Sequence, residues 1–232
     1  MAPAASWRPA GFWQRGAAWS IDTAVIAPGA LLLAWPWLAA AGHAWITQWR
    51  TLLQLGGEAL GHALVVGGPL PRLATAVLEA PGLREAIRAA HAATWSLAGP
   101  GLLAFVALGG LYHVAGECSR WQGGVGKHVL GLRACDRQGR RLGVGRACLR
   151  YLAASLSWAT LNLGHLMAAW PPRHLALHDR CSGTVVVASH DRLPHWAWAW
   201  LALLALAGLL ATAVLAVAGA AILRAALEHA IA

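Results

Sequence analysis

The feature that most constrains this chain is a run of 28 residues, 196–223, without a single charged side chain. At about 1.5 Å per residue, a helix of this length exceeds the roughly 30 Å hydrocarbon thickness of a bilayer. The run opens with Trp196, Trp198 and Trp200, and tryptophan is enriched where a helix meets the membrane interface. The run therefore predicts a membrane-spanning helix.

The composition excludes an ordinary soluble domain. Hydrophobic residues make up 58% of the chain and charged residues only 12%, whereas soluble domains carry about 25% charged residues. The 18 basic residues outnumber the 9 acidic ones and give a net charge of +9, which fits either nucleic acid or the cytoplasmic face of a membrane. Because the chain is so apolar, we expect the lipid bilayer as a partner and no nucleic acid.

Two further segments are long and apolar enough to cross a membrane. Residues 16–41 contain one charged residue, Asp22, and residues 93–115 contain none. Proline interrupts both segments, at Pro28 and Pro100, where a kink or break in the helix is expected.

A fourth segment, residues 147–170, is long enough to cross but unusually polar, and Arg150 is its one charge. We interpret it as a re-entrant or in-plane helical pair broken at Asn162–Gly164, which is tolerated where it packs against protein. The alternative is a fourth full span. The predicted fold is thus an all-α polytopic membrane protein with three or four membrane helices, this one re-entrant segment and a small β element.

The distribution of basic residues orients these spans. Residues 116–146 carry seven basic and two acidic residues, and residues 42–92 carry four basic and three acidic. Because Lys and Arg mark cytoplasmic loops, the former loop is predicted to be cytoplasmic and the latter external. Arg8 and Arg15 place the N-terminus in the cytoplasm. Apolar residues at near-helical spacing in 42–92 predict short amphipathic helices on the outer leaflet.

The β element is predicted on the cytoplasmic side. Residues 128–135 and 140–144 flank an Asp-Arg-Gln-Gly turn and indicate a β-hairpin within 126–146. Residues 183–188 are rich in β-branched side chains and indicate a third strand. Since only the hairpin could pair with this strand, residues 183–188 should be cytoplasmic too, which favours the re-entrant interpretation of 147–170.

Arg15 and Asp22 are the most informative charged pair. They lie seven residues apart, which is two helical turns and places both on one helix face. An ionised carboxylate inside a membrane is costly, so Asp22 should be paired, hydrated or protonated. It could form an ion or proton site or a contact with a partner subunit. It could also have a structural role, either as a pair with Arg15 or as the cap of a half-helix near Pro28.

Other reactive side chains do not form a recognisable site. Where a phosphate-binding loop needs an upstream glycine and a following Ser or Thr, this chain has Trp121 and His128. The histidines and cysteines lack the spacing of a tetrahedral metal site, and Ser182 lacks the order of a hydrolase triad. The four cysteines are interpreted as reduced thiols. We expect no metal, no cofactor and no enzymatic activity.

An ordered set of motifs over residues 12–188 resembles the RDD family of bacterial membrane proteins, named for one arginine and two aspartates. The motifs are Arg15 with Asp22, the stretch 126–133, a turn at 136–139 and the stretch 177–186. The resemblance assigns the three naming residues to Arg15, Asp22 and Asp179, and the cytoplasmic motif to Gly126, Lys127, Gly131, His178 and Thr184. The longer segment 42–92 and the helix at 196–223 depart from the family pattern.

This resemblance implies an RDD-like domain over residues 1–188, an additional C-terminal helix over 189–232, and a location in the bacterial inner membrane. Small residues at Gly208, Thr212 and Ala216 allow close helix packing. They favour an accessory or scaffold component of a membrane assembly, as a homo-oligomer or with other membrane proteins. The alternative is an oligomeric transporter or ion/proton antiporter that uses Asp22, since transport of an unknown ligand is often suggested for the family.

A last prediction concerns Asp179. We expect it to approach the cytoplasmic end of the first span and to meet Arg15, because an arginine at this boundary can reach into the headgroup layer. One arginine would then serve two aspartates, Asp22 and Asp179. The alternative is that Asp179 caps the turn before Gly183 by pairing with Arg180 or a backbone N–H.

Overall fold

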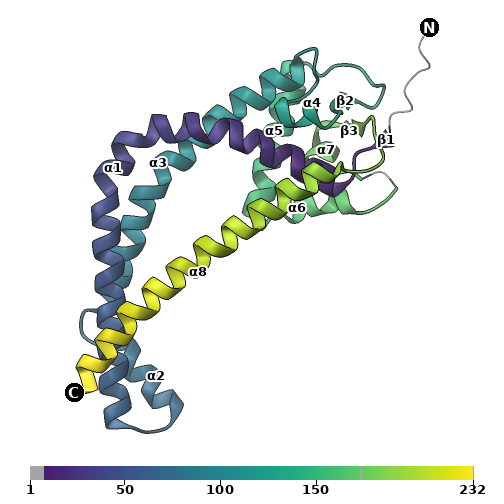
Figure 1. Ribbon diagram of the computed structural model, residues 1–232. Coiled ribbons are helices and arrows are strands. Elements are labelled where there is room, and N and C mark those ends of the chain that lie inside the picture. The colour runs from purple at the N-terminus through teal and green to yellow at the C-terminus, as the bar shows by residue number, and fades with distance from the viewer. Residues whose placement is uncertain (1–7, 173, 232) are drawn as a thin grey trace. The chain divides into compact units, whose positions relative to one another are not determined.

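The computed structural model describes residues 8–172 and 174–231 (Figure 1). The elements follow in the order β1 (Arg8–Pro9), α1 (Phe12–Val66), α2 (Leu70–Leu78), α3 (Leu83–Cys118), α4 (Val125–Val129), β2 (Leu132–Asp136), α5 (Val144–Ala159), α6 (Leu163–Leu166), η1 (Met167–Ala169), α7 (Leu177–Ser182), β3 (Thr184–Ala188) and α8 (His195–Ile231). The chain forms two compact units. The sheet unit comprises residues up to 32 and 104–203, and the helical unit comprises 33–103 and the residues from 204 on.

Three helices, α1, α3 and α8, are long and apolar enough to cross a membrane. They contain the three charge-poor segments of the sequence, so the predicted polytopic α-helical fold with a small sheet is confirmed. None of the residues in the most apolar 18-residue window of α8 is buried, as expected for a surface that faces lipid or another membrane protein.

Helix α1 differs from the prediction, because it is one continuous helix of 55 residues that passes Pro28 and includes residues 42–66. It ends where Gly67 and Gly68 take positive φ angles of 72° and 125° and Pro69 follows, a combination that stops a helix. Helix α3 likewise continues through Pro100. The prediction of separate amphipathic helices across 42–92 is therefore wrong except for α2, since the remaining helical residues belong to α1 and α3.

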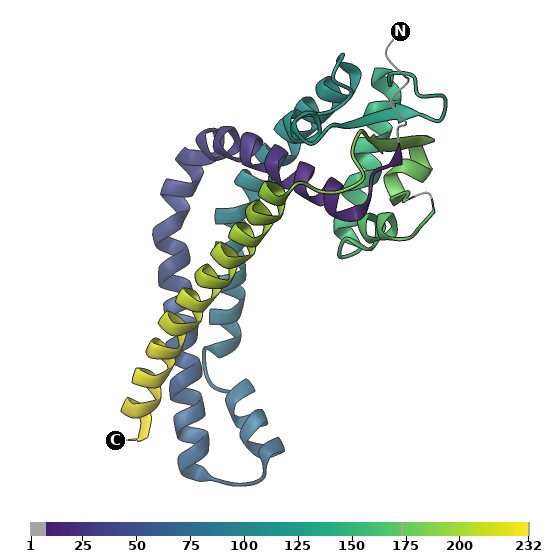
Figure 2. The same ribbon diagram turned by 45° about the vertical axis from the view of Figure 1, so that its right-hand side comes forward.

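The sheet has three antiparallel strands in the order β1-β3-β2. Strand β3 pairs with β2 from Leu132 opposite Ala188 to Asp136 opposite Thr184, and the two strands run side by side in Figure 2. The third strand was correctly predicted, but the hairpin was not. Residues 125–129 are helical, residues 140–144 do not form a strand, and the remaining strand of the sheet is β1 at the N-terminus, which pairs with β3 and not with β2.

Residues 140–144 do not form the predicted strand, although hydrogen bonds close the turn before them. The Asp136 carboxylate accepts from the backbone N–H groups of Gln138 and Arg140 at 2.9 and 2.8 Å, which closes the turn. Leu142 is then drawn into the core, and α5 begins at Val144. The backbone therefore leaves the sheet immediately after the turn.

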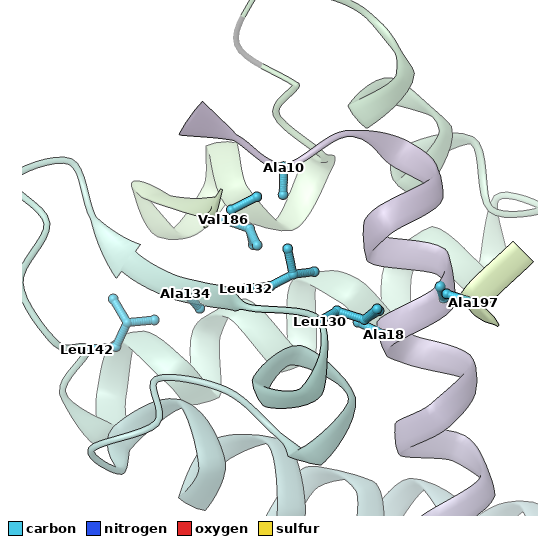
Figure 3. Packing of buried hydrophobic residues seen from close by; sticks show 10 residues of the cluster. Ala10, Ala18, Leu130, Leu132, Ala134, Leu142, Val186 and Ala197 are labelled. Carbon is cyan, nitrogen blue, oxygen red and sulfur yellow. The ribbon is translucent and has the colours of Figure 1, made fainter. Parts of the chain in front are cut away.

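A core of small and branched apolar residues holds the sheet against α1 and the start of α8. Leu132 and Val186 on neighbouring strands are almost fully buried and lie next to each other, with Ala10 beside them (Figure 3). Ala18 of α1 and Ala197 of α8 complete the contact with the helices. Because alanine is small, the helix backbones can approach the sheet closely.

The segment 147–170 does not form a membrane-spanning helix. Helix α5 ends at Ala159, and Asn162 takes a left-handed conformation with φ 65° before the short helix α6. Strand β2 precedes this segment and β3 follows it, and the two strands pair, so the chain returns to the side from which it started. This excludes the fourth span and agrees with a helical pair broken at Asn162.

Within the helical unit, glycines let α1 and α8 pack tightly. A Cβ atom at Gly57 would lie 2.7 Å from the Cβ of Ala226, and one at Gly61 would lie 2.5 Å from the Cβ of Ala230. This is the small-residue spacing that brings membrane helices together. The predicted stripe on α8 at Gly208, Thr212 and Ala216 is by contrast exposed.

Candidate functional site: a buried network of charges

Asp179 lies in the first turn of α7 and is 1% exposed. Its Oδ2 accepts a hydrogen bond from the backbone N–H of Ala176 at 3.0 Å, which satisfies one of the free N–H groups at the helix start. The alternative prediction, that Asp179 caps a local turn by accepting from a backbone N–H, therefore describes part of its role. The cap fixes the carboxylate in one orientation, with its remaining acceptor positions directed to the neighbouring helices.

Arg15 of α1 reaches this carboxylate. Its Nη1 donates to Asp179 Oδ2 at 2.5 Å, and its remaining N–H groups donate to the backbone oxygens of Ala10 at 2.9 Å and His174 at 2.7 Å. The predicted contact between Arg15 and Asp179 is present. The guanidinium thus ties α1 both to α7 and to the segment that leads into it.

Arg150 of α5 extends the contact on the other side of Asp179. It donates to Asp179 Oδ1, to the Thr184 hydroxyl at 2.7 Å, and through Nε to Glu117 of α3 at 3.1 Å. Glu117 also accepts from Lys127 of α4 at 2.5 Å.

We call Arg15, Asp179, Arg150, Glu117 and Lys127 the charge network. Positive and negative groups alternate along it, and each residue comes from a different helix, in the order α1, α7, α5, α3 and α4. All five side chains are at most 14% exposed. Since an unpaired buried charge is strongly unfavourable, the network requires these five helices to stay in place together.

The electrostatics of the network keep its charges fixed. Burial alone would raise the pKa of Asp179, but the charges of Arg150 and Arg15 outweigh it and hold that pKa well below its usual range. Burial would lower the pKa of Arg150, but Asp179 and Glu117 raise it above its usual value. Both groups therefore stay ionised at every physiological pH.

His178 borders the network in a different state. Burial, and secondarily the charge of Arg150, lower its pKa well below the usual value, so the imidazole is neutral at pH 7. Its Nε2 lies 3.5 Å from the Asp179 carboxylate, and its ring packs 5.3 Å from that of His165. Within the described residues its Nδ1 has no hydrogen-bond partner.

Asp22 belongs to a separate site. It is 1% exposed, and its Oδ1 accepts from the Tyr112 hydroxyl and from the backbone N–H of Gly126, both at 2.7 Å. The Tyr112 hydroxyl in turn accepts from Val125 N–H at 2.7 Å. Within residues 8–172 and 174–231, no hydrogen bond or ion pair joins Asp22 to Arg15, so the prediction that one arginine serves both aspartates is wrong.

The reason for this separation lies in the packing of α4. A Cβ at Gly126 would collide with the backbone oxygen of Ala18, so α4 rests directly on α1 and its backbone N–H reaches Asp22 first. The Asp22 Oδ2 has no hydrogen-bond partner among the described residues.

The remaining residues of the cytoplasmic motif have structural positions. Lys127 joins the charge network, Gly131 forms the turn into β2 with φ 64°, and Thr184 opens β3 and binds Arg150. The glycine-lysine turn therefore places Lys127 next to Glu117 and brings backbone N–H groups to Asp22.

Sequence reasoning missed three members of these two sites: Arg150, Glu117 and Tyr112. A signal for Arg150 existed, because it is the one charge in residues 147–170, and a lone charge in an apolar segment needs a partner. Glu117 gave a similar signal, because it is the first charged residue after the uncharged span 93–115. Nothing local marks Tyr112, which is 90 residues from its partner Asp22.

Metal-ligating residues do not gather at either site. In the part of the chain that the structure describes, no three His, Cys, Asp or Glu side chains are grouped to hold a metal ion. The cysteines Cys118, Cys135, Cys148 and Cys181 are all free thiols.

Three helices are apolar and long enough to cross a membrane, and a buried Arg–Asp network lies next to the small sheet. These features define a multi-pass membrane protein. The pattern of the RDD family matches residues 9–183, which is more than half of the chain, and the chain belongs to this family. It is also similar to the Uncharacterized protein YxaI of Bacillus subtilis (strain 168), with 35% identity over 88 residues. That match covers 38% of this chain and 58% of the relative. No solved structure matches the chain.

Proposed function

We propose that this protein is an accessory or scaffold component of an assembly in the bacterial inner membrane, without enzymatic activity. The observation that carries the proposal is the use of Asp179: both of its oxygens are taken by internal partners, Arg15, Arg150 and the backbone of Ala176. A carboxylate that is engaged in this way and only 1% exposed holds helices together and is closed to a ligand from outside. The family's naming arginine and one of its aspartates then serve to build a rigid module at the membrane surface.

Helix α8 is the surface that such a scaffold would offer. Its small residues Gly208, Thr212 and Ala216 share one face and are exposed, while α1 uses a comparable stripe to pack against the end of α8. A second stripe of this kind fits a second copy of the chain or another membrane helix.

We further propose that the sheet unit faces the cytoplasm and that the C-terminus lies outside. Strands β1, β2 and β3 pair and must share one side, and the segment 116–146 between α3 and α5 carries seven of the 18 basic residues. The positive-inside rule assigns such a side to the cytoplasm. With α1, α3 and α8 each crossing once, the chain ends on the opposite side. The basic residues would then meet anionic lipid headgroups, not nucleic acid.

A photo-reactive amino acid on α8 tests the scaffold role in native membranes. Placed at Thr212, it should cross-link to a second copy or to another membrane protein, because this face is the predicted contact. The matched control is Val214, which is 68% exposed on the opposite face of the helix. Protein cross-links of equal yield at both positions, or at neither, would contradict the proposal.

Transport is the second candidate, and the Asp22 Oδ2 favours it. A buried carboxylate oxygen without a hydrogen-bond partner is an unusual cost in a membrane helix and can be offset by a proton or a cation. A flux assay in proteoliposomes that compares the intact protein with Asp22→Asn decides between the two. Proton or sodium flux that Asp22→Asn abolishes would favour transport, and no flux from either protein would favour the scaffold.

A further inference from the structure

An open apolar cavity of about 560 Å³ lies in the sheet unit between α1, the end of α4 and the start of α8. Ile21, Ala24 and Val25 line it from α1, and Ala199 and Leu203 line it from α8. The volume is within the range of about 300–1,000 Å³ that small-molecule sites occupy. Every side chain that lines this cavity is apolar or aromatic, so its occupant must present hydrocarbon.

A second cavity of about 350 Å³ adjoins the first, because Val129 and Trp196 line both. Its lining is mixed: Leu130, Leu193 and Pro194 are apolar like the two shared residues, and Gln14, His190 and Arg192 are polar, with Arg192 the one fixed positive charge among them. An apolar cavity thus continues, across two shared side chains, into a mixed cavity that contains one arginine. The apolar cavity fits a hydrocarbon tail and the arginine of the second cavity fits an anionic head, so the pair matches an amphiphile.

Tryptophan residues place the junction of the cavities at the membrane interface. Trp196 forms part of both walls and is 48% exposed, and Trp13 packs 5.4 Å from Trp198 nearby. Since tryptophan collects at the level of lipid headgroups, the apolar cavity would open towards the acyl chains and the second cavity, with Arg192, towards the headgroups.

The charges around the second cavity favour an anion. The one carboxylate in this loop, Asp191, is paired with Arg8 at 2.9 Å, so its charge is compensated. Arg192 follows it directly and lines the cavity. Basic pockets between membrane helices on the cytoplasmic side are typical sites for anionic phospholipid headgroups.

We propose that the two cavities together bind one acidic glycerophospholipid, with an acyl chain in the apolar cavity and the phosphate beside Arg192. The lipid would fill the space between α1 and α8 where α8 leaves the sheet unit.

Native mass spectrometry of the intact protein, purified from mixed micelles with equal amounts of phosphatidylglycerol and phosphatidylcholine of identical chains, tests this proposal. The wild type should retain phosphatidylglycerol in about fivefold excess, the effect of one basic side chain near an anionic headgroup. Arg192→Gln should bring the ratio near one. Arg180→Gln is the matched control, because Arg180 is exposed but lines neither cavity, and it should leave the ratio unchanged.

A second pair of variants tests the apolar cavity. Ala199→Trp narrows it and should lower retention of both lipids, whereas Ala202→Trp, at an exposed position of the same helix outside the lining, should not. Because both alanines are exposed, neither substitution should disturb the core. An unchanged melting temperature will show that each variant folds. Equal retention of the two lipids, equal effects of Arg192→Gln and Arg180→Gln, or full retention by Ala199→Trp would overturn the proposal. So would a photo-reactive residue at Val25 that cross-links to a protein instead of a lipid.

Discussion

Replacing Asp179 by Asn should destabilise the protein more than any exposed charge removal. The change preserves the side-chain shape but leaves the guanidiniums of Arg15 and Arg150 without their shared counter-charge, and both are at most 13% exposed. Two hydrogen bonds to a charged group contribute about 1.5–3 kcal/mol each, and Asn retains one acceptor. The expected loss is therefore about 3–5 kcal/mol, the range found when one partner of a buried ion pair is removed.

The control is Asp191→Asn, which removes the same charge from an ion pair of 2.9 Å with Arg8 in which the side chains are 65% and 61% exposed. An exposed pair contributes about 0–1 kcal/mol. Unfolding by denaturant in mild detergent, followed by the fluorescence of the 14 tryptophans, measures both variants. Equal losses for Asp179→Asn and Asp191→Asn would refute the idea that the buried network stabilises the fold.

Three further predictions concern packing, pH and orientation. Gly126→Ala should lower the free energy of unfolding by about 1–3 kcal/mol, as overpacking does, because the added Cβ would meet the backbone of α1. The control, Gly145→Ala, has open space around it and should lose no stability in the same unfolding assay. The folded pKa of His178 is lowered by burial and by Arg150, so its contribution to stability is complete above about pH 6.5 and falls by up to about 1.4 kcal/mol per unit below that. His178→Gln should make the stability curve shallower below about pH 6.5, with the rest of the slope left to His165, whose pKa burial also lowers; an unchanged slope would contradict the prediction. An impermeant maleimide should label the exposed thiol of Cys181 in inside-out vesicles but not in intact spheroplasts, and the reverse result would invert the proposed topology.

The membrane helices could be predicted from the sequence because a long charge-free run has few alternatives. Strand β3 could be predicted from its β-branched residues for a similar reason. Strand β1 could not, since Arg8–Pro9 is two residues long and carries no periodic pattern. The continuity of α1 past Pro28 also escaped prediction, because a proline removes one hydrogen bond but the rest of the helix can persist around it.

One contact of the candidate site could be predicted from the sequence, and another could not. Arg15 and Asp179 could be connected because the order of the motifs placed both at one boundary, although 164 residues separate them. The partner of Asp22 could not be predicted, because a backbone N–H at Gly126 carries no signature of its own. The seven-residue spacing of Arg15 and Asp22 places both side chains on one helix face, but the packing of α4 determines that Asp22 binds the backbone N–H of Gly126.

A pair of double-mutant cycles tests the central claim that Arg15 serves Asp179 and not Asp22. Unfolding free energies are measured for Arg15→Gln, Asp179→Asn, Asp22→Asn and the two double variants that contain Arg15→Gln. Contacting residues couple by about 0.5–3 kcal/mol, whereas independent sites add to within about 0.5 kcal/mol. The structure predicts coupling of Arg15 with Asp179 and additivity with Asp22. Additivity with Asp179, or strong coupling with Asp22, would contradict it.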